Sequence, residues 1–162
     1  MKERVYRGMM NKSVNKEFVK SICFVVLWVV IIFSFSMQSG DESSELSGGI
    51  VAGIVELVFD GDFQYAEELE FFIRKLAHFT EYLVLGVLVM QTMKQTRHFE
   101  SVVVSIFASM LVCVLVASCD ETIQLFSGGR CGQVKDVVLD SCGALGGVVG
   151  SRGVLKKLFE RG

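Results

Sequence analysis

The sequence predicts an all-α integral membrane protein. We expect a four-transmembrane-helix bundle with both termini in the cytoplasm (N-in/C-in) and a short extracytoplasmic helix, interfacial or re-entrant, between helices 1 and 2. Half of the 162 residues are apolar (51%) and there is no proline. Two uncharged apolar runs, residues 21–40 and 101–119, are long enough to cross about 30 Å of hydrocarbon. Basic residues gather at the two ends and in a short middle segment, as cytoplasmic segments do.

The first span is predicted at about residues 20–38, and Lys12, Lys16 and Lys20 precede its apolar run, residues 21–40. A cleaved signal peptide is the competing interpretation, because residues 34–36 place small side chains where a signal peptidase would need them. The basic segment is long for a signal peptide, and the apolar run continues past that position. A retained membrane helix is therefore favoured.

The third span, residues 101–125, contains the second clear apolar run. The second and fourth spans, residues 74–94 and 136–152, begin with charged residues and then become apolar. Four spans place twelve of the sixteen Lys and Arg residues in the cytoplasm, but two spans built from the clear runs also place twelve there. We prefer four, because the apolar parts of the weaker segments would otherwise need another place to bury their surface.

These spans divide the chain into a basic cytoplasmic N-terminus (1–20), a membrane domain (21–152) and a basic cytoplasmic tail (153–162). The connection between the first two spans opens with a polar turn, residues 38–44, that contains helix-capping residues. Residues 47–59 then read as an apolar helix of about thirteen residues, which is too short to span. We expect it to lie in the outer interface or to dip into it.

Polar side chains converge at the outer ends of three spans under this topology. Ionisable groups near hydrocarbon are costly, and they indicate a functional site by default. The second span contributes five, the third three and the fourth two, and the loop between the third and fourth adds an arginine. These candidate ligand-binding residues are Arg74, Lys75, His78, Glu81, Tyr82, Asp120, Glu121, Gln124, Arg130, Asp136 and Asp140.

Small residues predict how the helices pack. In the fourth span, Gly143, Gly146, Gly147 and Gly150 form one stripe that lets another helix approach closely. The third span has a small face as well, and it is a plausible partner for the glycines. Its members are Ser105, Ser109, Cys113 and Ala117.

The helix dipole separates structural from functional interpretations. The two aspartates of the fourth span lie at a helix N-terminus, where acids are favourable. Arg74 and Lys75 are cations at an N-terminus, and Asp120 and Glu121 are acids near a C-terminus, so both pairs need other partners. They could neutralise one another or bind a ligand. Lys75 could instead extend to the interface.

His78 is a candidate acid, base or ligand because several carboxylates surround it. A metal site built from His78, Glu81, Asp120 and Asp140 is conceivable, but no HExxH or comparable spacing supports it. We therefore expect no metal and no cofactor. The five cysteines form no CxxC pair, and four lie in or beside apolar runs, where cysteine acts as a small hydrophobe.

Three segments, taken in order, resemble the VanZ-like family of bacterial membrane proteins. They read FSMQSGDESSELS after the first span, RKLAHFTEYLVLG in the second, and DETIQLFSGGRCGQVKDVVLDSCGALGG across the third and fourth. Ser43 and Ser44 match a Ser-Ser pair that the family often has, whereas a proline common there is missing. The resemblance implies a multi-pass protein of the bacterial cell membrane. The family's namesake is linked to teicoplanin resistance in Gram-positive bacteria.

Three functions remain open. The favoured one is a non-enzymatic protein that binds an amphiphile at the outer leaflet, held by Arg74, Lys75 and Arg130. The ligand would be a membrane lipid, a lipid-linked cell-wall intermediate or a lipoglycopeptide. The second is an enzyme acting on an envelope lipid, with catalytic candidates that we list as His78, Glu81, Asp120, Glu121 and Asp140. The third is a structural ion-pair network. The net charge of −2 does not argue for or against nucleic acid; we expect none, and we allow for a homo-oligomer.

Overall fold

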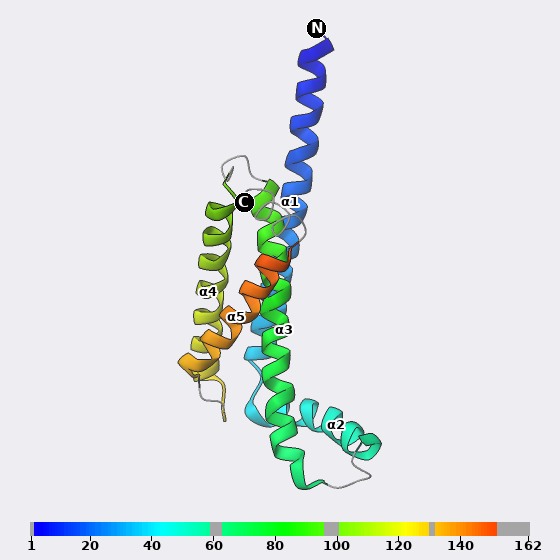
Figure 1. Ribbon diagram of the computed structural model, residues 1–162, viewed down its shortest axis with the longest axis vertical. Coiled ribbons are helices and arrows are strands. Elements are labelled where there is room, and N and C mark those ends of the chain that lie inside the picture. The colour runs from blue at the N-terminus through cyan, green and yellow to red at the C-terminus, as the bar shows by residue number, and fades with distance from the viewer. Residues whose placement is uncertain (1, 59–62, 96–100, 130–131, 152–162) are drawn as a thin grey trace, which may run out of the picture.

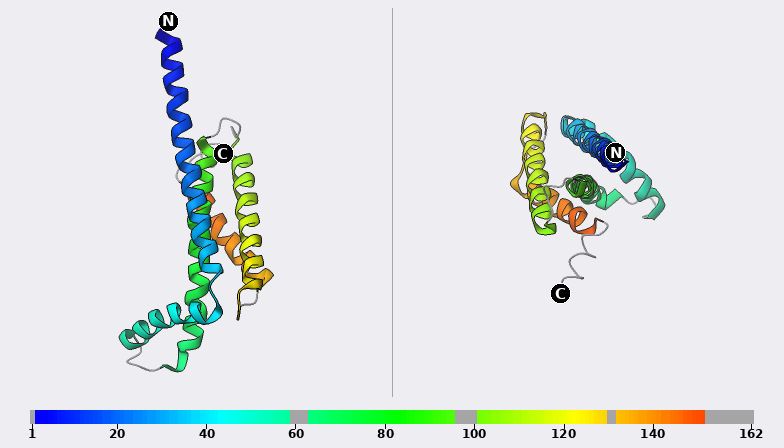
Figure 2. Two further views of the ribbon diagram at one scale, coloured as in Figure 1. Left: turned by 180° about the vertical axis from the view of Figure 1, so that it is seen from behind. Right: turned by 90° about the horizontal axis from the view of Figure 1, so that it is seen from above.

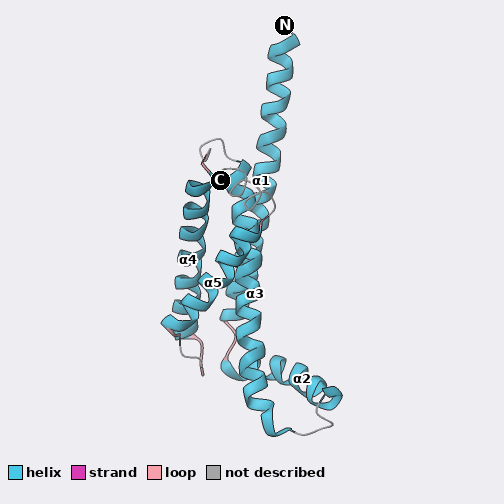
Figure 3. Cartoon of the chain, in the orientation of Figure 1, coloured by secondary structure: helices cyan, strands magenta, loops and turns pink. Residues whose placement is uncertain are grey.

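The computed structural model describes residues 2–58, 63–95, 101–129 and 132–151, and within these residues every regular element is helical (Figure 3). The predicted all-α class is therefore confirmed. Arg130, Cys131 and the tail 153–162 lie outside the described residues. The elements are α1 (Lys2–Ser36), α2 (Gly40–Val58), a short 3-10 turn (Phe63–Tyr65), α3 (Ala66–Gln95), α4 (Val102–Phe126) and α5 (Val134–Gly150).

Helices α1, α3 and α4 run along the long axis, and α5 crosses them at a slant (Figure 1). Viewed from above, α3 occupies the middle of the bundle, and it contacts all four other helices (Figure 2). Within the described residues, three helices are long and apolar enough to cross a membrane: α1 over Lys16–Ser36, α3 and α4. Helix α5 corresponds to the predicted fourth span but has only 17 residues.

The apolar side chains of the bundle face outward as well as inward. Phe24 and Leu27 on α1, and Phe107 and Leu111 on α4, are all exposed. Among the described residues, the main cluster of buried apolar side chains is small, and its residues come from α1, α3, α4 and α5. They are Ile32, Tyr82, Leu85, Val89, Cys113, Ala117 and Ala144. An apolar outer surface around a small core suits a lipid environment.

Helix α2 projects sideways from the lower end of the bundle, beside the start of α3 and away from α4 (Figure 1). A capping box fixes its first turn: the Ser39 N–H donates to Glu42 Oε2 (2.9 Å) and the Glu42 N–H donates to Ser39 Oγ (3.3 Å). The helix thus begins at Gly40, and most of the predicted polar turn 38–44 is helical. With 19 residues α2 is longer than expected. It buries one row toward α3, formed by Ser43, Ser47, Val51 and Val55.

Glycines bring α5 against the backbone of α3. A Cβ atom on Gly147 would lie 2.0 Å from the Leu83 carbonyl oxygen, and one on Gly143 would lie 2.3 Å from that of Phe79. Gly86 on α3 meets the Ala144 carbonyl in the same way, at 2.2 Å. The expectation that the glycine stripe meets the small face of α4 is therefore wrong for these positions. A Cβ atom on Gly150 would have no described atom within 4 Å.

The small face of α4 is buried, as predicted, and part of it faces α3. Ser109 donates to Met90 Sδ on α3 at 3.6 Å, and Cys113 and Ala117 join the shared core. Cys113 is a free thiol, as are Cys23, Cys119 and Cys142. The face lets α4 approach α3 while the glycines do the same for α5.

Candidate functional site

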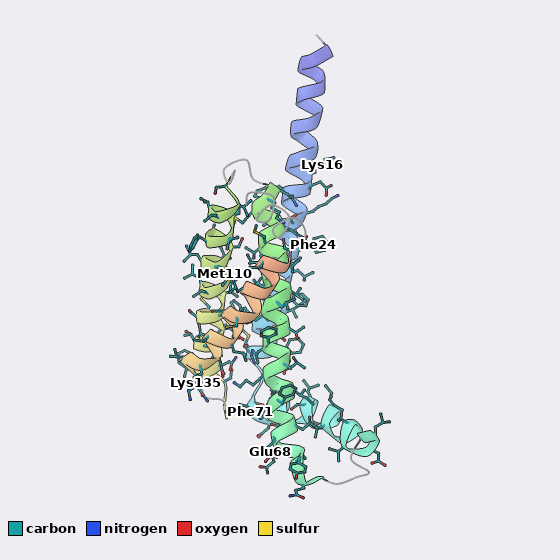
Figure 4. All side chains as sticks on the ribbon, in the orientation of Figure 1. Lys16, Phe24, Glu68, Phe71, Met110 and Lys135 are labelled. Carbon is teal, nitrogen blue, oxygen red and sulfur yellow. The ribbon has the colours of Figure 1, made fainter. Side chains whose placement is uncertain are left out.

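The polar residues of the second, third and fourth predicted spans meet at one end of the bundle. In Figure 4, Phe71 near the start of α3 and Lys135 at the start of α5 lie toward the lower end, whereas Lys16 on α1 lies near the upper one. Each of the three helices turns its polar residues inward here, because the i, i+4 spacing of Asp120 and Gln124 on α4 keeps them on one face. Asp136 and Asp140 have the same spacing on α5.

Three side chains from three helices form the centre of this end. His78 on α3, Asp120 on α4 and Asp140 on α5 each offer one nitrogen or oxygen atom within 4.8 Å of the others. Asp120 and Asp140 are fully buried, and the His78 side chain is 19% exposed. His78 Nδ1 lies 3.9 Å from Asp140 Oδ1. We call these three residues the His-Asp-Asp cluster.

A polar network ties the cluster to α1. Gln124 donates from Nε2 both to Asp120 Oδ2 and to Ser36 Oγ, each at 3.3 Å. Ser127 Oγ donates to the Ser36 carbonyl at 2.8 Å. Because Gln124 and Ser36 are nearly fully buried, this network fixes the position of Asp120 relative to the end of α1.

Glu121 holds the start of α5. Its Oε2 accepts a hydrogen bond from the backbone N–H of Gln133, the N-cap residue of α5, at 2.8 Å. A Cβ atom on the preceding Gly132 would lie 2.5 Å from the Glu121 carbonyl oxygen, so only glycine fits there. Glu121 therefore has a structural role at the α4–α5 connection.

Lys75 pairs with Asp136 across α3 and α5, and its ammonium also lies over the Phe71 ring, 5.3 Å from the centroid. Its side chain is only partly exposed, so the interpretation that Lys75 extends to the interface is not needed. The dipole argument for Arg74 and Lys75 is wrong, because α3 begins at Ala66 and both cations lie about two turns inside it.

Arg74 points toward α2. Its guanidinium lies 3.7 Å from Glu70 Oε1 and 3.5 Å from the hydroxyl of Ser44 on α2. Glu70 also accepts a hydrogen bond from Ser47 Oγ at 3.1 Å. These polar contacts attach α2 to the first turns of α3.

Two cavities meet at Arg74 and His78. The first, of about 430 Å³, lies between α1, α2 and α3 and is largely apolar, with Phe35, Ile50 and Ile73 in its wall. The second, of about 280 Å³, lies between α3, α4 and α5, and its polar wall includes Lys75, Gln124 and Asp136. Arg74 and His78 line both cavities.

Comparison with models of protein families identifies the family of this chain. The model of the VanZ/LLP1 family matches residues 21–156, which is most of the chain. The chain belongs to the VanZ/LLP1 family. Comparison with curated proteins and with solved structures returned no match. With its three membrane-like helices, the chain is a VanZ-like membrane protein, and the predicted resemblance is confirmed.

Glu81 and Tyr82, two further candidates of this VanZ-family protein, also lie outside the His-Asp-Asp cluster. Glu81 lines the apolar cavity, and its backbone carbonyl accepts a hydrogen bond from Trp28 Nε1 at 2.9 Å. Among the described residues, the donor atoms within 4.8 Å of one another belong to His78, Asp120 and Asp140, and Glu81 is not part of that group. Tyr82 is fully buried in the core, and its hydroxyl has no hydrogen-bond partner among the described residues.

Several residues that position the site were not among the candidates predicted from the sequence. Ser36 receives hydrogen bonds from α4 and from the following loop, and Trp28 anchors α1 to α3. Gln133 presents its backbone to Glu121. Ser36 carries a signal in hindsight, since it directly precedes the polar segment that ends the first span. A backbone contact such as that of Gln133 leaves no pattern in the sequence.

Proposed function

We propose that this VanZ-like protein spans the bacterial cell membrane four times, with both termini in the cytoplasm and α2 at the outer interface. Helix α5 would be the fourth span: at 1.5 Å per residue its 17 residues extend roughly 26 Å. The shared core supports this arrangement, because α3 and α5 contribute to it together with the more apolar α1 and α4. The basic tail 153–162 would be cytoplasmic.

We propose further that the outer end binds an amphiphile with an anionic head group. The observation that carries this proposal is the pair of cavities that share Arg74 and His78. The apolar cavity between α1, α2 and α3 suits an acyl or prenyl chain, and the guanidinium at its boundary suits a phosphate or carboxylate. A phospholipid, a lipid-linked cell-wall intermediate and a lipoglycopeptide all have this chemistry.

Native mass spectrometry of the purified full chain tests lipid binding. We expect the wild type to retain phosphatidylglycerol or an added polyprenyl phosphate, and Arg74→Ala to bind either about tenfold to a hundredfold more weakly, because a charge-assisted contact is lost. Lys135→Ala is the matched control, because Lys135 is an exposed cation at the same end that lines neither cavity. Equal binding by all three folded proteins would rule out the site.

A membrane enzyme is the alternative function, and the His-Asp-Asp cluster favours it. His78 would act as general base on a lipid substrate, with Asp120 or Asp140 as acid. The same mass spectra test this alternative, since a hydrolysed or transferred lipid appears as a new mass on incubation with the wild type. If only intact lipid is recovered over hours, the binding function stands and the enzymatic one fails.

If the protein binds lipoglycopeptides, its expression should contribute to resistance of the cell against them. A bacterium that expresses the chain would tolerate more teicoplanin than one that expresses Arg74→Ala at the same membrane level. Equal inhibitory concentrations of teicoplanin for the two strains would show that this protein does not contribute to resistance. They would not contradict the proposal that it binds a lipid.

A further inference from the structure

We propose that His78, Asp120 and Asp140 form a binding site for a divalent transition-metal ion of the Zn²⁺ or Mn²⁺ type. One imidazole and two carboxylates are a donor set that such ions accept, whereas a purely carboxylate set would favour Mg²⁺ or Ca²⁺. The three ligands come from α3, α4 and α5, so the ion would join three helices at one point.

The distances suit a site that tightens around its ion. The three donor atoms lie within 4.8 Å of one another, and ligands around a tetrahedral zinc lie roughly 3.4 Å apart. Small rotations of the carboxylates would close the difference. The three backbones are held by independent contacts, including the glycine packing of α5 on α3 and the Gln124 bonds to Asp120 and Ser36.

A buried side chain without hydrogen bonds is the observation that singles out this cluster as a ligand site. Asp140 is fully buried, and neither of its carboxylate oxygens has a hydrogen-bond partner among the described residues. Its nearest cationic candidate, His78 Nδ1, lies at 3.9 Å, beyond hydrogen-bond distance. Buried carboxylates in native proteins are almost always hydrogen-bonded, paired or bound to a metal. Metal ligation would satisfy Asp140.

The charges around the cluster also favour a bound cation. Lys75 pairs with Asp136 and Arg74 with Glu70, so the two cations of α3 nearest the cluster already have acidic partners. A bound divalent ion would offset the two buried aspartates directly. Three protein ligands leave at least one coordination position open. His78 also lines the polar cavity, from which water or a ligand oxygen could fill that position.

Metal binding to the purified full chain tests the site without any reference to activity. The protein is stripped with a chelator, reloaded with Zn²⁺, Mn²⁺ or, as the comparison, Mg²⁺, and analysed by elemental mass spectrometry and calorimetry. We expect one Zn²⁺ or Mn²⁺ per wild-type chain and at least about tenfold weaker binding by Asp140→Asn and Asp120→Asn. Asp136→Asn is the matched control, because it removes the same charge one turn away on α5.

Two further readouts keep the proposal falsifiable if an aspartate variant folds poorly. Zn²⁺ should raise the thermal unfolding temperature of the wild type and of Asp136→Asn, but not that of His78→Gln. Co²⁺ bound to the wild type should give visible d–d absorption that His78→Gln lacks. Absence of stoichiometric metal in the folded wild type, or equal binding by Asp140→Asn, would overturn the site. The lipid-binding experiment is independent of either result.

Discussion

At the residue scale, the pairing of Lys75 with Asp136 shows how α3 and α5 neutralise charge near the membrane. The two side chains are 28% and 15% exposed, so both are partly desolvated. Their surroundings differ, however. Asp136 lies in the first turn of α5, where the helix dipole favours an acid, whereas Lys75 has the Phe71 ring beside it.

This asymmetry predicts unequal effects of removing either partner. Lys75→Met should lower the free energy of unfolding by about 1–3 kcal/mol, since it leaves a poorly exposed carboxylate without its cation. Asp136→Asn should cost less, because the long lysine side chain can turn its ammonium toward water. Unfolding by denaturant in detergent measures both, with Lys135→Met as the surface control. Equal losses, or a larger loss for Asp136→Asn, would contradict this account.

The same residues show which features of the site could be predicted from the sequence and which could not. The identities of the polar side chains and the end of the bundle at which they gather followed from charge and topology. The pairing did not, because Arg74 and Lys75 were placed at a helix N-terminus that lies further upstream, at Ala66. Residues 66–73 mix charged and aromatic side chains, and hydropathy alone excludes such a mixture from a span.

At the element scale, the approach of α5 to α3 depends on individual glycines of the 143–150 stripe. Their spacing predicted the packing face of α5 but not the helix that it meets. The small face of α4 had a compatible pattern, and spacing within one helix carries no information on which neighbour is closest. The structure resolves this, because Gly143 and Gly147 lie against the α3 backbone.

Substitution along the stripe should therefore have position-dependent effects. Gly147→Ala puts a methyl group 2.0 Å from the Leu83 carbonyl oxygen, so the helices must separate. We expect a loss of about 1–3 kcal/mol in unfolding free energy, as in other overpacked sites. Gly150→Ala meets no atom of the described residues within 4 Å and should be neutral or slightly stabilising. Denaturant titration measures the unfolding free energy of the two variants. Equal unfolding free energies would refute the close contact at Gly147.

At the scale of the whole molecule, the bundle has one polar end, beside which α2 packs on α3, and an apolar outer surface over the rest. Hydropathy found the apolar runs within α1 and α4, but it gave α5 little weight, since 17 residues with an acidic start resemble a soluble helix as much as a span. Charge bias could not decide between two and four spans either, because both give the same count of cytoplasmic Lys and Arg. The shared core is the additional argument for four.

Topology can be mapped with single cysteines in a background without the five native ones. Four spans place Glu45 and Lys135 outside and Lys94 inside, whereas two spans place Glu45 and Lys94 outside and Lys135 inside. All three side chains are exposed. We expect a membrane-impermeant maleimide to label Glu45→Cys and Lys135→Cys on intact cells, and Lys94→Cys only after permeabilisation. Labelling of Lys94→Cys but not Lys135→Cys on intact cells would instead put the start of α5, and with it the His-Asp-Asp cluster, out of reach of any outer-leaflet ligand.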